Sequence, residues 1–248
     1  MSTESVIYLD HAATSGKKAP GVSTAVAAYL DGLAANVNRS TYAVSSQAAM
    51  RVLECRELLA SRFHFASPSH VVFTPGQTAG LNMVIKGLLR PGDRVVVSSM
   101  EHNAVMRPLN QLQRLAGIKI DRVPCAPDGT LDPRAILPYL HEDTRLAVFT
   151  HASNVCGTML PVQEIGELLY ARGIPFVLDA AQTAGHVPID FGALHLSALA
   201  VPGHKGLRCC WIRISANGWN RFSAAARAAP PIARSSPPTC RTGLNPAR

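Results

Sequence analysis

The chain has 248 residues, of which 47% are hydrophobic, and a formal net charge of +8. This length is enough for one large α/β domain with a sizeable core. The sequence has no apolar run of membrane-spanning length and no signal-peptide pattern at its start, so we expect a cytoplasmic protein that does not bind membranes. The six cysteines form no CxxC pair and have no histidines at zinc-ligand spacing, which argues against a disulfide framework and against a metal site.

The positive charge is concentrated at one end of the sequence. Seven of the 24 Lys and Arg residues follow Leu207, whereas all 16 Asp and Glu residues precede it, so residues 1–207 carry a net charge of only +1. A nucleic-acid-binding protein that uses this arginine-rich tail has only the charge in its favour, because no interleaved aromatic residues or recognisable binding fold accompany it. We therefore expect no nucleic-acid partner.

Two helices are expected first, at 21–33 and 45–62. Short β-branched runs then alternate with amphipathic segments, which is typical of a largely parallel sheet with helices on both faces. The strands are expected at 71–74, 94–98, 118–123, 146–150, 176–178 and 196–201. The helices between them are expected at 78–89, 104–116, 133–140 and 162–172, the third beginning with Asp132 as its cap and Pro133 in its first turn.

Two residues that follow apolar strands carry candidate chemistry. Asp179 follows Pro-Phe-Val-Leu, so it should lie at the carboxyl end of a strand, where open α/β sheets bind ligands. A carboxylate there can keep a pyridine nitrogen protonated, although an aspartate in this place is also a common helix cap. Lys205 lies in Val-Pro-Gly-His-Lys-Gly, which favours an inward loop where partial desolvation makes the amine nucleophilic. The alternative for Lys205 is a solvated surface charge.

Three further candidates would complete a pyridoxal-phosphate (PLP) site, which needs a lysine, an acid, a flat ring and an anion cradle. Thr78 lies in Thr-Pro-Gly-Gln-Thr between a strand and a helix, where backbone amides can bind a phosphate, or it is a plain helix cap. His102 can lay its imidazole on the pyridine ring, or it is structural. Asn154 can offer its amide to the phenolic oxygen, or it forms a turn.

Taken together, these positions resemble the class V aminotransferase family of fold-type I PLP enzymes, and within it the cysteine desulfurase and selenocysteine lyase group. The resemblance covers nearly all of residues 6–207. It implies an α/β fold, the large domain of a PLP-dependent transferase, here incomplete. It is carried by Tyr-Leu-Asp-His-Ala-Ala-Thr, Phe-Thr-Pro-Gly-Gln-Thr, Glu-His-Asn, Ser-Asn-Val-Cys-Gly-Thr, Asp-Ala-Ala-Gln and Gly-His-Lys-Gly.

The resemblance also implies a role for each matching residue. Lys205 would form the Schiff base with PLP, Asp179 would pair with the pyridine nitrogen, and His102 would stack on the ring. The phenolic oxygen would be contacted by Gln182 and Asn154, and the phosphate would be held by Gln77, Thr78 and His204. Pro202 stands where many relatives have a serine, so one phosphate hydroxyl is missing.

The reaction that the resemblance implies is removal of sulfur from L-cysteine, which gives alanine and an enzyme persulfide. It also implies a small amino-acid substrate, a homodimer and a sulfur-acceptor protein. The persulfide cysteine and the arginine that binds the substrate carboxylate belong to a part of the family that this sequence does not show. Two alternatives stay open: a class V aminotransferase or lyase that acts on another amino acid, and a non-catalytic fragment.

Residues 208–248 do not match the family. We chose plausible codons for two segments of this tail and read them two letters later. Residues 208–222 then give a stretch that contains acidic residues again, and residues 240–248 give a Gly-Thr motif typical of the family. We therefore expect a PLP-binding domain with its N-terminal segment over 1–207 and a frameshifted, aberrant tail over 208–248, and hence an inactive chain. Either the sheet lacks the strand that should follow the lysine, or residues 209–214 pair there as a substitute.

Overall fold

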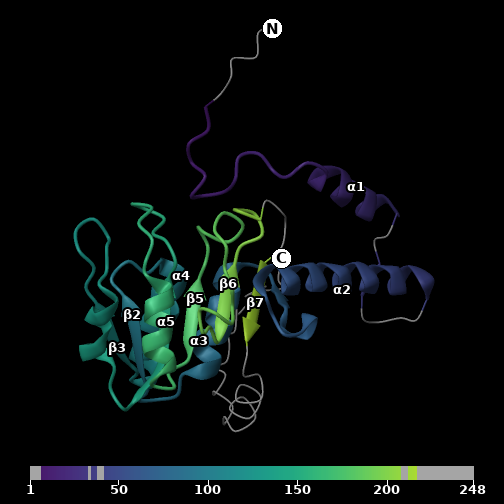
Figure 1. The fold of residues 1–248 in the computed structure, drawn as a ribbon. Helices are drawn as coiled ribbons and strands as arrows, with labels where there is room; N and C mark the ends of the chain where they lie inside the picture. Colours follow the sequence, from purple (N-terminus) through teal and green to yellow (C-terminus); the bar gives the residue numbers. More distant parts are fainter. Residues whose placement is uncertain (1–6, 33–34, 38–41, 208–211, 217–248) are drawn as a thin grey trace, which may run out of the picture.

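A computed structural model describes residues 7–32, 35–37, 42–207 and 212–216. Its centre is a seven-stranded sheet in the order β1-β7-β6-β5-β4-β2-β3 (Figure 1). Strands β3, β2, β4, β5 and β6 run parallel to one another, and this confirms the mostly parallel α/β fold expected from the sequence. None of the helices in the described ranges is both long and apolar enough to cross a membrane.

The expected elements are present, with boundaries that shift by a few residues at most. The strands are Val72–Thr74 (β1), Arg94–Ser98 (β2), Lys119–Val123 (β3), Thr144–Thr150 (β4), Phe176–Asp179 (β5) and Ala198–Val201 (β6). The α-helices are Val22–Gly32 (α1), Ala43–Phe63 (α2), Gln77–Leu88 (α3), Asn103–Ala116 (α4) and Val162–Tyr170 (α5). A short 3-10 turn, Pro68–His70 (η1), precedes β1.

The helix expected at 133–140 is a 3-10 helix, Pro133–Tyr139 (η2), rather than an α-helix. The expected cap is present, since the side chain of Asp132 accepts a hydrogen bond from the amide of Arg134. Pro138 lies inside the segment, and a proline there lacks the amide that an α-helix would use and clashes with the preceding turn. The segment therefore winds as a 3-10 helix, which is tighter than an α-helix.

The sheet separates two apolar cores. Along β4, Leu146 and Val148 belong to one core, whereas Ala147 and Phe149 belong to the other, because alternate side chains of a strand point to opposite faces. Helices α3 and α4 cover the first face, and α5 with η2 covers the second. Burial on both faces explains why the central strands are continuous apolar runs rather than alternating ones.

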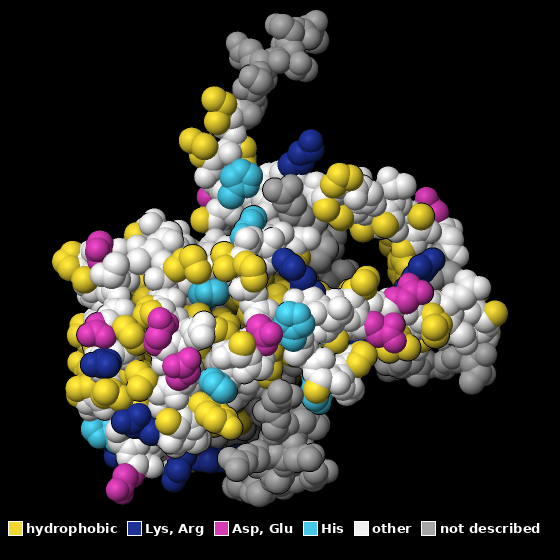
Figure 2. Space-filling view, in the orientation of Figure 1, with side chains coloured by type: hydrophobic (Ala, Val, Ile, Leu, Met, Phe, Trp, Pro, Cys, Tyr) yellow, Lys and Arg dark blue, Asp and Glu magenta, His cyan; other side chains and the backbone are white. Residues whose placement is uncertain are grey.

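The first two helices form an arm beside the sheet. Figure 1 shows α2 extending sideways from the sheet and α1 lying apart from it. None of the residues of α1 is buried, and Figure 2 shows hydrophobic side chains along this arm. A groove of about 960 Å³ lies between the two helices, lined by residues of both, including Tyr29 and Met50. The arm therefore exposes apolar surface to the solvent.

A seventh strand, Ile212–Ala216 (β7), lies between β1 and β6 and runs antiparallel to both. The expectation that the sheet lacks a strand here is therefore wrong. The alternative of a substitute strand at 209–214 is closer: the described strand covers 212–216, and residues 209–211 lie outside the described residues. Strands β1 and β6 would otherwise each present unpaired backbone groups, and β7 satisfies both edges at once. Most of the expected aberrant tail, residues 208–211 and 217–248, lies outside the described residues.

Candidate active site

A pocket of about 340 Å³ opens at the carboxyl ends of the parallel strands. Its walls come from the loops after β1, β2, β4, β5 and β6 and from the N-terminal segment near Ala13. The structure brings all eight residues that were expected to bind PLP into the lining of this one pocket. They are Gln77, Thr78, His102, Asn154, Asp179, Gln182, His204 and Lys205.

Asp179 is the last residue of β5 and is almost completely buried, with 2% of its surface exposed. Its Oδ1 accepts a hydrogen bond from the amide of Ala181 at 2.9 Å and another from the side-chain amide of Gln77. Burial raises the pKa of this carboxyl, whereas these hydrogen bonds and the charges of His102 and Lys205 oppose the rise. Asp179 is therefore a carboxylate aimed into the pocket and not a simple helix cap.

Lys205 is half-buried on the loop after β6 and lines the pocket with Asp179. Burial lowers the pKa of its amine, although the charge of Asp179 acts in the opposite direction. A larger fraction of neutral amine at neutral pH favours attack on a carbonyl carbon. The alternative of a freely solvated surface lysine does not match this position.

The loop that carries Lys205 lies very close to the turn after β5. A Cβ atom added at Gly206 would overlap the backbone oxygen of Ala184, and one added at Gly185 would overlap the backbone of Gly206. Gly185 also has a φ of +87°, which favours glycine. Only glycines allow this approach, and they fix the lysine loop beside the strand end that carries Asp179.

The N-terminal segment fixes the other side of the lysine loop. The hydroxyl of Ser15 donates to the carbonyl of Lys205 at 2.8 Å, and the ammonium of Lys18 donates to the carbonyl of His204 at 3.1 Å. The pKa of His204 is lowered by burial and by the charges of Lys205 and Lys18. The amide of Gln182 donates to the carbonyl of Ala12 at 3.2 Å, which binds the same segment to the turn after β5.

His102 has a structural contact and still faces the pocket. It caps α4, because its Nδ1 accepts a hydrogen bond from the amide of Ala104 at 3.0 Å. The ring lines the pocket, and Nε2 is not used by this cap. The structural interpretation of His102 and the ring-stacking interpretation are therefore compatible.

The remaining expected residues lie around the rim. Thr78 is inside the first turn of α3 and is not its cap, since Gly76 occupies the cap position. Asn154 is exposed on the turn after β4, where the hydroxyl of Ser153 accepts from the amide of Val155. The amide of Gln77, expected at the phosphate, points to Asp179 and to the carbonyl of Ala200 instead, at 3.4 Å from the latter. Their contacts with a cofactor stay predictions.

The sequence interpretation did not single out Glu101 or Thr150. Glu101 lies in the Glu-His-Asn motif, next to His102, and accepts a hydrogen bond from the amide of Thr150 at 2.8 Å. Thr150 lines the pocket beside Asp179. An acidic residue three positions after the apolar strand β2 was the available signal, but only the fold shows that the Glu101 carboxyl is buried.

The comparisons with known proteins agree on one family. Similar curated proteins include a probable cysteine desulfurase of Methanothermobacter thermautotrophicus, 37% identical over 81% of this chain and 50% of that protein. An IscS-like cysteine desulfurase of Mycobacterium tuberculosis is 36% identical over 80% of this chain and 52% of that protein. The chain thus spans about half the length of the curated relatives it matches.

Solved structures show the same likeness. The apo cysteine desulfurase of Thermococcus onnurineus NA1 superposes with a TM-score of 0.80 at 30% identity, covering 86% of this chain and 54% of that one. A structure described as SspA in complex with cysteine gives a TM-score of 0.78 at 25% identity, covering 85% of this chain and 61% of that one. A family profile described as Aminotransferase class-V matches residues 7–208. The chain belongs to the class V aminotransferase family.

Proposed function

We propose that this chain contains the PLP-binding site of a cysteine desulfurase. The observation that carries the proposal is the pairing in one pocket of half-buried Lys205 with fully buried Asp179. The residues present fit the cofactor, because a lysine amine, a buried carboxylate and an imidazole line the same cavity. When bound, PLP supplies an electron sink for chemistry at the α-carbon of an amino acid.

Each of these residues has a distinct part in the proposed chemistry. Lys205 would hold the cofactor covalently through its neutral amine, and the charge of Asp179 would keep a proton on the pyridine nitrogen. Gln77 donates to Asp179 and so fixes the direction of the carboxylate. His102, already oriented by its cap contact, would lie on the ring and exclude water from that face.

Cysteine is the proposed substrate because of the relatives. Two of the similar curated proteins are described as cysteine desulfurases, and the SspA structure is described as a complex with cysteine. The described lining of the pocket contains neither an arginine to bind the substrate carboxylate nor a cysteine to accept sulfur. We therefore propose that the chain as written binds PLP but does not release alanine from cysteine.

The test of cofactor binding is reconstitution of the purified chain with PLP. Reduction with borohydride followed by peptide mass spectrometry should place the cofactor on Lys205, and Lys205→Ala should abolish the cofactor absorbance band. Lys86→Ala is the matched control, since Lys86 is exposed on α3 and lies outside the pocket. Modification of another lysine with equal yield would disprove the assignment. Robust alanine release by the unaltered chain would disprove the second part of the proposal.

We also propose that residues 208–248 are the product of a frameshift. The family match ends at residue 208, and no acidic residue follows Asp190, whereas seven arginines follow Leu207. Sequencing the coding DNA around Leu207 tests this proposal. The frame read two letters later should stay open well beyond this chain and encode a cysteine and an arginine suited to catalysis. A stop within a few codons of that frame would rule the frameshift out.

A homodimer is the proposed assembly. The exposed apolar side chains of α1 and α2, such as Leu30 and Leu58 at 63% and 72% exposure, support it because a soluble chain rarely leaves so much apolar surface on one arm. Sedimentation of the purified chain should give twice the monomer mass. Leu30→Lys should shift the equilibrium toward the monomer, and a sedimentation profile that this change leaves intact would place the contact elsewhere.

A further inference from the structure

Glu101 is a buried carboxyl that the proposed chemistry has not used. Its Oε1 accepts two hydrogen bonds, from the hydroxyl of Ser98 at 2.5 Å and from the amide of Thr150 at 2.8 Å. Ser98 ends β2 and Thr150 ends β4, so one carboxyl oxygen joins the carboxyl ends of two neighbouring strands. Thr150 is in turn paired in register with Asp179 on β5. Glu101 therefore links the ends of β2 and β4, and the end of β4 lies beside the strand end that carries Asp179. These three strand ends form the floor of the pocket.

The second oxygen of Glu101 indicates the charge that the carboxyl carries. Oε2 is buried and has no hydrogen-bond partner among the described residues. A buried anionic oxygen without a donor is far more costly than a neutral hydroxyl in the same place. Burial, together with the charge of Asp179, raises the pKa of Glu101 to about 8, although the hydrogen bonds from Ser98 and Thr150 oppose the rise. The unpartnered oxygen and the raised pKa both favour the protonated form of Glu101 at neutral pH.

Asp179 has positively charged neighbours, whereas Glu101 has none among the described residues that acts on its pKa. Asp179 is stabilised as an anion by the amides of Gln77 and Ala181 and by the charges of His102 and Lys205. The charged group that acts on Glu101 among the described residues is Asp179 itself, which repels a second negative charge. Of these two buried carboxyls, Asp179 is the one placed to keep the charge.

We propose that Glu101 is a positioning residue: as a neutral acid it clamps Ser98 to Thr150 and leaves the single negative charge of the pocket floor on Asp179. This inference rests on the proposed function, because the charge on Asp179 matters there for the pyridine nitrogen of PLP. Two buried carboxylates that repel each other would compete for the negative charge. A neutral Glu101 avoids that competition and holds the floor of the pocket in place.

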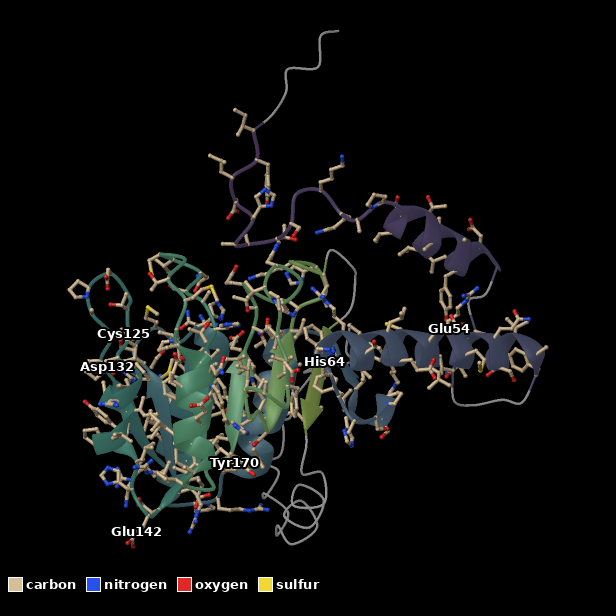
Figure 3. The ribbon with its side chains drawn as sticks, in the orientation of Figure 1. Glu54, His64, Cys125, Asp132, Glu142 and Tyr170 are labelled. Carbon is tan, nitrogen blue, oxygen red and sulfur yellow. The ribbon has the colours of Figure 1, made fainter. Side chains whose placement is uncertain are left out.

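The first test uses the chain without cofactor, so its result does not depend on whether PLP binds. Infrared difference spectra at neutral pH should show the carbonyl stretch of a buried protonated carboxylic acid, and Glu101→Gln should remove it. Asp179→Asn should leave the band in place, which assigns it to Glu101. Glu142→Gln is the matched surface control, and Figure 3 shows Glu142 at the end of the sheet away from Cys125 and the pocket loops. A spectrum without this band, or a band lost only in Asp179→Asn, would overturn the proposal.

The second test measures PLP affinity and the pH dependence of cofactor absorbance. Glu101→Ala should weaken PLP binding by about tenfold, since it leaves the Thr150 amide and the Ser98 hydroxyl without their acceptor. Glu101→Gln should recover most of this loss, because its amide oxygen can accept both hydrogen bonds without a charge. A glutamine variant as weak as the alanine variant, or one whose absorbance titrates differently from the parent below pH 8, would show that the charge of Glu101 is required. If Glu101→Ala does not fold, the glutamine variant and the infrared band still decide the question.

Discussion

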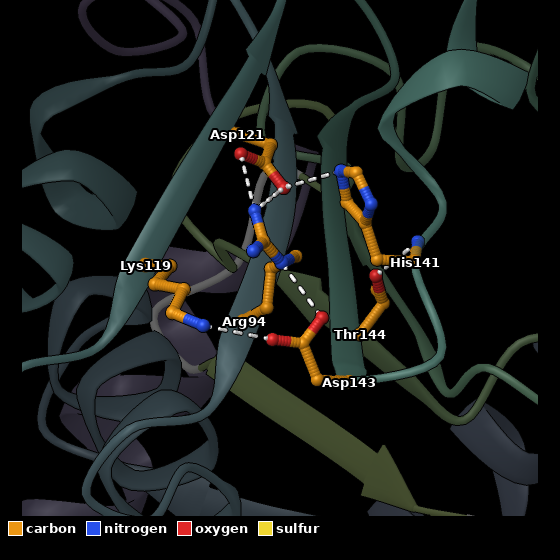
Figure 4. Close-up of polar contacts among 6 residues, drawn as sticks. All are labelled: Arg94, Lys119, Asp121, His141, Asp143 and Thr144. Carbon is orange, nitrogen blue, oxygen red and sulfur yellow. Dashed lines mark hydrogen bonds and ion pairs between the residues drawn. The ribbon is translucent and has the colours of Figure 1, made fainter.

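The two ends of the parallel sheet hold their carboxylates in opposite ways. At the amino end, the guanidinium of Arg94 contacts Asp121 and Asp143 at 2.8 Å each, and Lys119 contacts Asp143 at 3.1 Å (Figure 4). At the carboxyl end, Asp179 is buried beside Gln77 with no ion pair at salt-bridge distance among the described residues. The pKa of Asp143 is lowered to about 2 by Arg94 and Lys119, whereas burial raises the pKa of Asp179.

This contrast separates a structural cluster from a binding site within one sheet. Carboxylates that are fully paired stabilise the fold and have no remaining attraction for a ligand. A buried carboxylate without a cation costs folding free energy, and that cost is recovered only when a cationic group binds. The amino end thus stabilises the sheet, whereas the buried carboxyl at the other end is, under the proposed function, the partner of a protonated ring nitrogen.

The largest expected effect comes from removing the charge of Asp179. Asp179→Asn should lower PLP affinity by about 10–100-fold, because a charge-assisted hydrogen bond is lost. The same change should raise the melting temperature of the cofactor-free chain, since a raised carboxyl pKa means that the charge destabilises the fold at neutral pH. Asp143→Asn is the matched control: it should lower the melting temperature and leave PLP affinity unchanged. If both variants lose stability and affinity together, the two ends do not differ as we infer.

Loss of the cation at the amino end should act on stability alone. Arg94 is only 18% exposed, so Arg94→Met should cost about 1–3 kcal/mol by leaving Asp121 and Asp143 without their shared partner. Chemical denaturation measures this change, and PLP affinity should stay at the parent value. Arg145→Met is the control at an exposed position on β4 and should be nearly neutral. A comparable loss for both variants would mean that the Arg94 cluster adds nothing specific.

Much of this arrangement could be predicted from the sequence, because short apolar strands followed by Asp179, Lys205 and His102 fix which side chains meet at the carboxyl ends. The direction of Gln77 could not, since an amide side chain takes either Asp179 or a phosphate depending on which is within reach. Strand β7 was also missed in part. Its pairing depends on the empty place between β1 and β6, which only the assembled sheet creates. The buried Glu101 was missed for the same reason, because burial is a property of the fold.

The contributions of the two ends to stability should also change with pH in opposite directions. Asp143, with its lowered pKa, contributes stability that is present above its ordinary value of 3.8 and is lost as the pH falls toward 2. Glu101, with its raised pKa, contributes stability that is present below 4.5 and is lost as the pH rises through about 8. The melting temperature of the cofactor-free chain should therefore depend less on pH in two variants. Asp143→Asn should reduce the dependence at low pH, and Glu101→Gln should reduce it as the pH approaches 8. A single variant that flattens both limbs would contradict the separation of the two ends.

Substitution of Cys156 is expected to have the smallest effect on the proposed reaction, although its thiol is activated. Hydrogen bonds with Ser153 and Thr158 lower its pKa to about 7, so much of it is thiolate at neutral pH. It is exposed, however, and lines a neighbouring pocket of about 540 Å³ with Cys125 instead of the pocket that contains Lys205.

Iodoacetamide should therefore label Cys156 faster than Cys125, as peptide mass spectrometry can measure. In a longer chain read in the shifted frame, Cys156→Ala should keep desulfurase activity within about twofold of the parent, because a residue outside the pocket does not reach the transition state. Reactivity of a thiol and its use in catalysis are different properties, and position relative to Lys205 decides between them. Loss of persulfide formation in Cys156→Ala with intact PLP absorbance would show that the neighbouring pocket takes part in sulfur transfer after all.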